Sequence, residues 1–185
     1  DGDAGGQFSL GYCYFTGRGV SKNFSDGIKW LCLAANHGQS DAQLLMGEAY
    51  MKGLGVEKDD KAAFGWFQKS AVQGNCYGQH ALGMCFKRGR GTETNLTEAF
   101  NWLEKSAESG FDKAEVELAK MYRDGIGVEQ NSEQAFNWIQ KAALQGNSYA
   151  QGDLSLYYAF GDNVNKDLVE SYKWIALANE SDPRA

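Results

Sequence analysis

The stretch Asp59–Gly74, DDKAAFGWFQKSAVQG, decides the fold because its tryptophan belongs to a regular series. The chain of 185 residues has five tryptophans, and each follows the one before it by 36 residues. They are Trp30, Trp66, Trp102, Trp138 and Trp174. Self-similarity at one period of about 20–50 residues marks a repeat array.

Other positions keep the same period. An Asn or Asp precedes each tryptophan by seven residues, and a pair of glycines precedes that residue, as Gly53 and Gly55 do before Asp59. In the last copy the second glycine is replaced by Asn163. We therefore predict a single domain over 1–185, with repeats at about 3–38, 39–74, 75–110, 111–146 and 147–182.

Each repeat carries the signals of two helices. Apolar residues recur at spacings of three and four from Ala42 to Tyr50, which is the period of a helix. The following GLGV segment ends that helix, because glycine accepts the left-handed conformation of a helix end. Asp59 is a natural cap for a second helix, which ends at Gly74.

Two columns of residues are expected to bring these helices together. Small residues equivalent to Gly47 permit close approach within a repeat, and we expect Trp66 and its equivalents to wedge between a second helix and the first helix of the next repeat. Such pairs stack into an all-α superhelix, or solenoid, in which each repeat covers its neighbour.

The segment Ala42–Gly74, AQLLMGEAYMKGLGVEKDDKAAFGWFQKSAVQG, resembles the Sel-1-like repeat, a relative of the tetratricopeptide repeat. The resemblance extends from about Gly5 to Ala178. It implies a right-handed α-α superhelix that acts as an interaction scaffold and is not an enzyme. Family members occur in the bacterial periplasm, secreted or in the cytoplasm, and some in the eukaryotic secretory pathway, so the compartment stays open.

Composition excludes some classes of partner. The net charge of −6 argues against a protein whose whole surface binds nucleic acid or membrane headgroups. No apolar run approaches the roughly 20 residues of a membrane span. The cysteines Cys13, Cys32, Cys76 and Cys85 lack CxxC spacing, and we expect free thiols, with a Cys13–Cys32 pair as the alternative.

Motifs that would indicate catalysis are missing from the sequence. There is no SxxK, GxSxG or HExxH, and the glycine pairs do not have phosphate-loop spacing. Cys76 and His80 have the i, i+4 spacing of half a zinc site, but a metal would need ligands from elsewhere. We predict no catalytic residue, cofactor or metal.

Two alternatives remain open beside the scaffold. A cysteine-rich branch of the resembled family is described as β-lactamase-like, which suggests a β-lactam or peptidoglycan-related envelope enzyme or accessory protein. That branch carries regularly spaced cysteine pairs that this chain lacks. The other alternative is a purely structural segment of a longer array.

Three glycosylation sequons, at Asn23, Asn95 and Asn179, are expected to be coincidental, because two of them fall on the capping position.

The resemblance places the first helix of each repeat on the inner, concave wall, where a protein or peptide partner would lie. Residues there vary between copies, and several are aromatic or basic. The predicted groove residues are Phe8, Tyr12, Phe15, Lys52, His80, Met84, Lys87, Arg88, Lys120 and Arg123. A basic edge inside an acidic protein favours an acidic partner. The alternative is that these cations are ordinary solvated side chains near helix ends. Self-association through an exposed C-terminal repeat is also expected.

Overall fold

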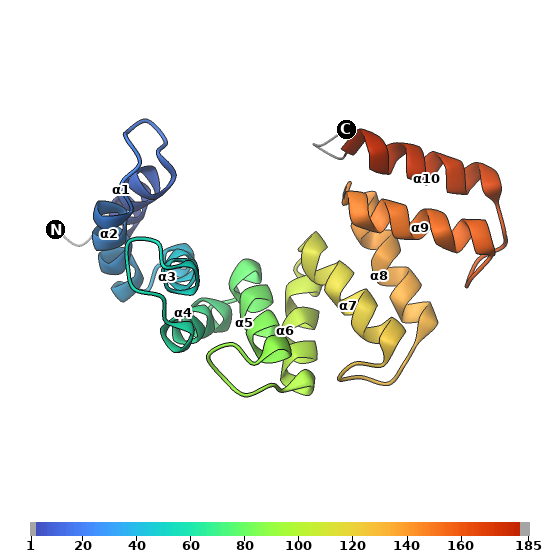
Figure 1. Cartoon of the computed structure of the whole chain (residues 1–185), viewed down its shortest axis with the longest axis horizontal. Helices are drawn as coiled ribbons and strands as arrows, with labels where there is room; N and C mark the ends of the chain where they lie inside the picture. The colour runs from blue at the N-terminus through green and yellow to red at the C-terminus, as the bar shows by residue number, and fades with distance from the viewer. Residues whose placement is uncertain (1–2, 182–185) are drawn as a thin grey trace. The chain divides into compact units, whose positions relative to one another are not determined.

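The computed structural model describes residues 3–181, and within that range it consists of α-helices without β-strands (Figure 1). It divides into two compact units, Asp1–Asn95 and Leu96–Ala185, which are described separately. The first unit holds α1 (Ala4–Thr16), α2 (Phe24–Asn36), α3 (Ser40–Lys52), α4 (Asp60–Val72) and α5 (Cys76–Arg88). The second holds α6 (Leu96–Glu108), α7 (Asp112–Asp124), α8 (Ser132–Leu144), α9 (Ser148–Phe160) and α10 (Leu168–Ser181).

The helices keep the period of the sequence. Odd-numbered helices begin 36 residues apart, at 4, 40, 76, 112 and 148, and even-numbered helices begin at 24, 60, 96, 132 and 168. The prediction of an all-α fold of five 36-residue helix-turn-helix repeats is thereby confirmed. The single domain over 1–185 remains a prediction.

Local capping explains where the helices start and stop. The Asp59 carboxylate accepts hydrogen bonds from the backbone amides of Lys61 and Ala62, at 2.8 and 3.0 Å. Asn131 accepts one from Gln134 in the same way. At the other end, Gly53 takes a left-handed conformation and its amide bonds the carbonyl of Ala49. These contacts confirm the predicted caps.

In the three middle repeats the second glycine of the pair is required by space as well as by conformation, whereas a Cβ atom at Gly19 would meet nothing within 4 Å. Gly91 and Gly127 have φ of 70° and 73°, and a Cβ atom at either would overlap a backbone carbonyl oxygen at the start of a preceding helix, that of Asp60 or Leu96. Asn163, which replaces glycine in the last loop, has φ 57°, a region that Asn tolerates better than most residues.

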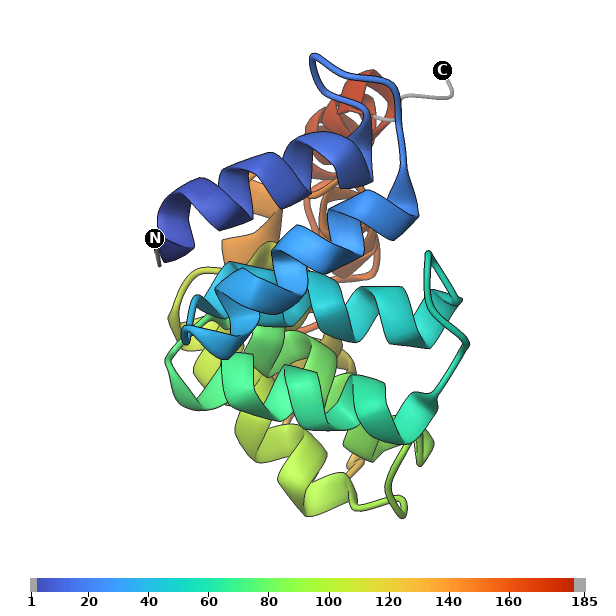
Figure 2. The same cartoon turned by 90° about the vertical axis from the view of Figure 1, so that its left-hand side faces the viewer.

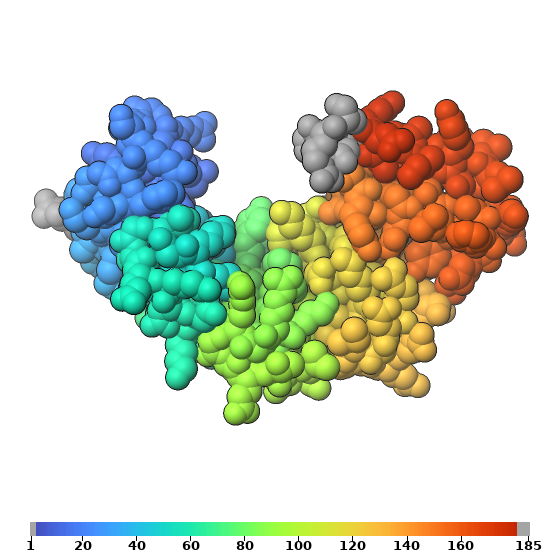
Figure 3. Space-filling view, viewed as in Figure 1, coloured from blue at the N-terminus to red at the C-terminus, as the bar shows by residue number. Residues whose placement is uncertain are grey.

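Close approach between helices builds the core of each unit. Helices that are consecutive within a unit pack against one another, as Figure 2 shows for α1 to α5, and their side chains fill the space between them (Figure 3). A Cβ atom at Gly47 would lie 2.5 Å from the ring of Phe67, which is fully buried. The small residue therefore lets α3 and α4 touch, as predicted.

Trp66 and Trp138 each pack against a core cluster of their unit, and the cluster at Trp138 includes Ala150 and Leu154 of α9, the first helix of the next repeat. Trp66 of α4 contacts the core cluster formed by side chains of α1, α2 and α3, which precede it. The ammonium group of Lys69 lies over the Trp66 ring, 4.1 Å from the ring centroid. Trp102 and Trp138 have the same lysine three residues on. The wedging of each tryptophan between a second helix and the first helix of the next repeat stays a prediction.

Candidate functional site

The first unit has a groove of about 270 Å³ between α3, α4 and α5. Its lining residues are Glu48, Met51, Lys52, Phe67, His80, Ala81, Met84, Cys85, Arg88 and Arg90. Four predicted site residues, Lys52, His80, Met84 and Arg88, therefore lie together. The last three are spaced by four along α5 and so share one helix face. Phe67 and Cys85, both almost fully buried, belong to the floor of the groove.

The cations of this groove are not equivalent. Lys52 donates to the carboxylate of Glu48, four residues before it on α3, at 2.8 Å. By contrast, no ion pair within residues 3–181 engages Arg88 or Arg90. Arg90, which sequence reasoning missed, lies in the loop after α5. The sequence did offer a sign of it, because Arg90 follows two residues after Arg88, the last residue of α5. Lys87 does not line the groove.

Burial raises the pKa of the Cys85 thiol to about 11. The charge of Asp60 also raises it, whereas Arg90 and Arg88 lower it. A thiol with so high a pKa stays protonated at neutral pH and is a poor nucleophile. All four cysteines are free, which confirms the expectation of free thiols.

The predicted aromatic residues of α1 separate into two kinds. Phe8 and Tyr12 have ring centroids 5.9 Å apart, and Tyr12 is exposed. Phe15 is only 7% exposed, and its ring packs edge-on against Phe24 of α2 at 5.1 Å. Phe15 is therefore a correction to the predicted groove set. Positions close together along a helix can face opposite sides, and the Phe15 side chain lies on the side that faces the core.

Lys120 and Arg123, both on α7 in the second unit, are held by acidic side chains of that unit. Lys120 lies 3.1 Å from Glu117 and above the ring of Tyr149. Arg123 pairs with Asp124 at 3.3 Å and with Asp153 of α9 at 3.2 Å. Both cations are therefore already partly neutralised within the unit.

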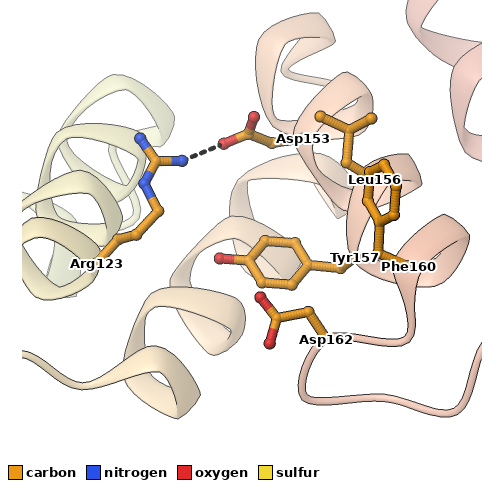
Figure 4. Close-up of a pocket in the computed structure, with 6 residues that line it drawn as sticks. All are labelled: Arg123, Asp153, Leu156, Tyr157, Phe160 and Asp162. Atoms are coloured by element: carbon orange, nitrogen blue, oxygen red, sulfur yellow. Dashed lines mark hydrogen bonds and ion pairs between the residues drawn. The ribbon is translucent and has the colours of Figure 1, made fainter.

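A second hollow, of about 410 Å³, adjoins Arg123 in this unit (Figure 4). Its lining residues are Arg123, Asp153, Leu156, Tyr157, Phe160 and Asp162. Burial, together with the charges of Asp153 and Asp162, raises the pKa of Tyr157, and Arg123 opposes this. The predicted groove residues did not include Leu156 and Phe160. The apolar character of Phe160 at a position that is polar in the other four repeats was the missed signal.

The described part of the chain offers neither a cluster of metal ligands nor a membrane-spanning helix. Across residues 3–181, no group of three or more His, Cys, Asp or Glu side chains is placed to hold a metal ion. No helix in this range has the length and apolar character needed to cross a bilayer. The sequon residue Asn23 caps α2 and donates its side-chain amide to Asp26 at 2.7 Å.

Comparisons with known proteins agree with the repeat architecture. The family model of the Sel1 repeat matches five times, at residues 4–39, 40–75, 76–111, 112–147 and 148–182. Comparison with curated protein sequences gave no match.

Among solved structures, c5321, a protective antigen of uropathogenic Escherichia coli strains displaying an SLR fold, is 36% identical with a TM-score of 0.87. The match covers 97% of this chain but only 38% of that protein. A Sel1 repeat protein from Oxalobacter formigenes is 30% identical with a TM-score of 0.86, over 96% of this chain and 71% of that one.

The immunity protein Pa5087 from Pseudomonas aeruginosa, 20% identical with a TM-score of 0.65, shares the fold. Its match covers 98% of this chain and 67% of that protein.

Proposed function

Because the chain belongs to the Sel1 repeat family, we propose that it is a non-enzymatic protein-interaction scaffold whose first unit binds a protein or peptide partner. The partner lies in the groove between α3 and α5 and presents an acidic side chain beside an apolar one. The observation that carries this proposal is the pair Arg88 and Arg90 at the groove, which no ion pair within residues 3–181 neutralises.

The chemistry of the groove supports such a partner. A guanidinium group offers a planar set of donors that matches a carboxylate in two parallel hydrogen bonds. Met51 and Met84 provide flexible apolar walls next to these donors, and methionine adapts its shape to different guests. We also include Phe8 and Tyr12 of α1, which belong to the same unit, among the proposed partner-binding residues.

Site-specific crosslinking tests the proposal. A photoreactive amino acid at position 84 is expected to crosslink a partner in lysate of cells that express the protein. The double variant Arg88→Ala/Arg90→Ala is expected to abolish this product, and rising salt to weaken it, because exposed charges are screened.

The control is Arg18→Ala/Lys58→Ala, which removes the same charge from exposed positions outside the groove. Equal crosslinking by both double variants would refute the groove as the acidic-partner site. The absence of any crosslinked protein would count against the scaffold proposal itself.

We propose in addition that α10 mediates self-association. Tyr172 is 73% exposed, whereas its equivalents Ile28, Phe100 and Phe136 are each 9% exposed. Ile175 is 40% exposed, and its equivalents in the other repeats are fully buried. An apolar stripe of this kind gains free energy when a second surface covers it. Sedimentation that shows a monomer at all concentrations, unchanged in Tyr172→Ser/Ile175→Ser, would contradict this proposal.

A further inference from the structure

The wall of α9 carries two exposed apolar side chains where other repeats are mostly polar. Phe160 is 80% exposed and Leu156 is 53% exposed. The residues equivalent to Phe160 are Thr16, Lys52, Arg88 and Asp124. All four are polar or charged, so this position needs no apolar side chain for folding. A large apolar side chain that contributes so little to the core is a candidate anchor for a partner.

Leu156 and Phe160 line the hollow of the second unit together with Tyr157. Figure 4 shows the Tyr157 ring between Asp153 and Asp162, with Leu156 and Phe160 to one side and Arg123 opposite. Tyr157 is half-buried, and its ring meets Phe136 of α8 edge-on at 5.3 Å. This contact packs the Tyr157 ring against the core of the unit.

The charge of the hollow is unbalanced toward the acidic side. Arg123 is shared between Asp124 and Asp153. Asp162 accepts a hydrogen bond from Asn163 but takes part in no ion pair within the described range 3–181. Among the residues that line the hollow, one cation, Arg123, stands beside two carboxylates, and of these two only Asp162 lacks an ion pair within residues 3–181.

The same imbalance extends over the whole second half of the sequence. Residues 96–185 contain 15 acidic and 8 basic side chains, a net charge of −7, whereas residues 1–95 contain 9 acidic and 10 basic side chains, a net charge of +1. The acidity of the protein therefore belongs to its second half. Potentials of this sign attract cationic partners and speed their encounter.

We propose that the α9 hollow is a second docking surface, which binds a basic peptide segment with a lysine or arginine next to a large apolar residue. The cation of the segment pairs with Asp162, and the apolar residue packs on Leu156 and Phe160. This surface differs from the first-unit groove in location and in the sign of its charge. It does not depend on that groove binding anything.

Fluorescence anisotropy with three labelled decapeptides tests the proposal. The first alternates lysine and leucine, the second alternates glutamate and leucine, and the third alternates lysine and glycine. We expect the intact chain to bind the first peptide at least about tenfold more tightly than either of the others, since both charge and apolar contact contribute.

Variants then locate the binding on the molecule. Phe160→Ala and Asp162→Asn are each expected to weaken binding of the lysine–leucine peptide by about tenfold, the scale of an interface anchor. Leu144→Ala and Glu129→Gln are the matched controls, because both residues are exposed in the same unit and neither lines the hollow. Circular dichroism confirms equal helicity of all four variants.

Several outcomes would overturn the proposal. If the control variants weakened binding equally, the peptide would be held by general attraction between opposite charges and not by the hollow. Tighter binding of the glutamate–leucine peptide, or no binding of any peptide, would exclude a basic guest. Sedimentation that shows a dimer of the intact chain, lost in Phe160→Ala, would assign the hollow to a second copy instead.

Discussion

Gln145 donates its side-chain amide to a carboxylate oxygen of Glu115 at 2.8 Å, joining positions thirty residues apart. The same contact occurs in the second repeat, where Gln73 donates to Gln43 at 2.7 Å, and in the first, where His37 meets Gln7 at 2.9 Å. The amide of Gln43 also donates to the carbonyl of Ala35. Glu115 cannot make this second contact as a carboxylate, because it has no donor.

The first prediction concerns this buried carboxylate, whose residue is only 2% exposed. Glu115→Gln is expected to stabilise the fold at neutral pH by about 1 kcal/mol, the typical net value of one hydrogen bond. The new amide can donate to the carbonyl of Ala107, as Gln43 does to Ala35, while its oxygen still accepts from Gln145. Urea unfolding at pH 7 measures the change, with the exposed Glu129→Gln as control.

The pH dependence of this difference follows from the pKa of Glu115. Burial raises that pKa above 4.5, as does Asp112, whereas Lys141 and the bond from Gln145 lower it. The folded state therefore holds the proton more tightly than the unfolded state, and stability falls as pH rises through this window. The advantage of Glu115→Gln should grow from about pH 4 upward. An advantage independent of pH would contradict this account.

Two glycines within helices predict opposite effects of alanine. Gly47→Ala should destabilise the protein by about 1–3 kcal/mol, because the added methyl group overlaps the buried ring of Phe67. Gly65→Ala on α4 should stabilise it by about 0.5–1 kcal/mol, since nothing lies within 4 Å of the added atom and alanine favours the helix. Chemical denaturation measures both. A stabilising Gly47→Ala would show that α3 and α4 separate easily.

The caps can be tested by a matched pair of substitutions at Asp59. Asp59→Ala removes the acceptor for the amides of Lys61 and Ala62 and should cost about 1 kcal/mol. Asp59→Asn should cost much less, because Asn23 and Asn131 cap their helices at the same position. Thermal unfolding followed by circular dichroism compares them. Equal losses would mean that the negative charge, rather than the hydrogen bond, stabilises the helix start.

Cysteine alkylation tests the burial of Cys85. This residue is 1% exposed, and its pKa of about 11 keeps it as the thiol at pH 8. Iodoacetamide should therefore modify Cys13, Cys32 and Cys76, which are partly exposed, well before Cys85. Mass spectrometry of digested protein identifies each site, and alkylation in denaturant provides the reference. Modification of Cys85 as fast as Cys13 would show that the groove floor opens to solvent.

The candidate site could be predicted only in part. Helix-face spacing brought His80, Met84 and Arg88 together correctly, and Glu48 four residues before Lys52 was already a visible sign of a neutralised lysine. For Arg123 the sequence showed only the adjacent Asp124, because its other acidic partner, Asp153, lies thirty residues away on α9. Reach between helices depends on how they pack, which the spacing of residues along one helix does not contain.

The sequence by itself determined the five repeats, the class of fold and the ends of the helices. These features follow from local physical chemistry: the period of apolar residues, the capping side chains and the glycines that accept positive φ. Only the tertiary structure decided that Phe15 faces inward and that Arg88 and Asp162 keep unpaired charge. Those outcomes depend on which side chains meet across helices, and burial and ion pairing arise only when that packing is complete.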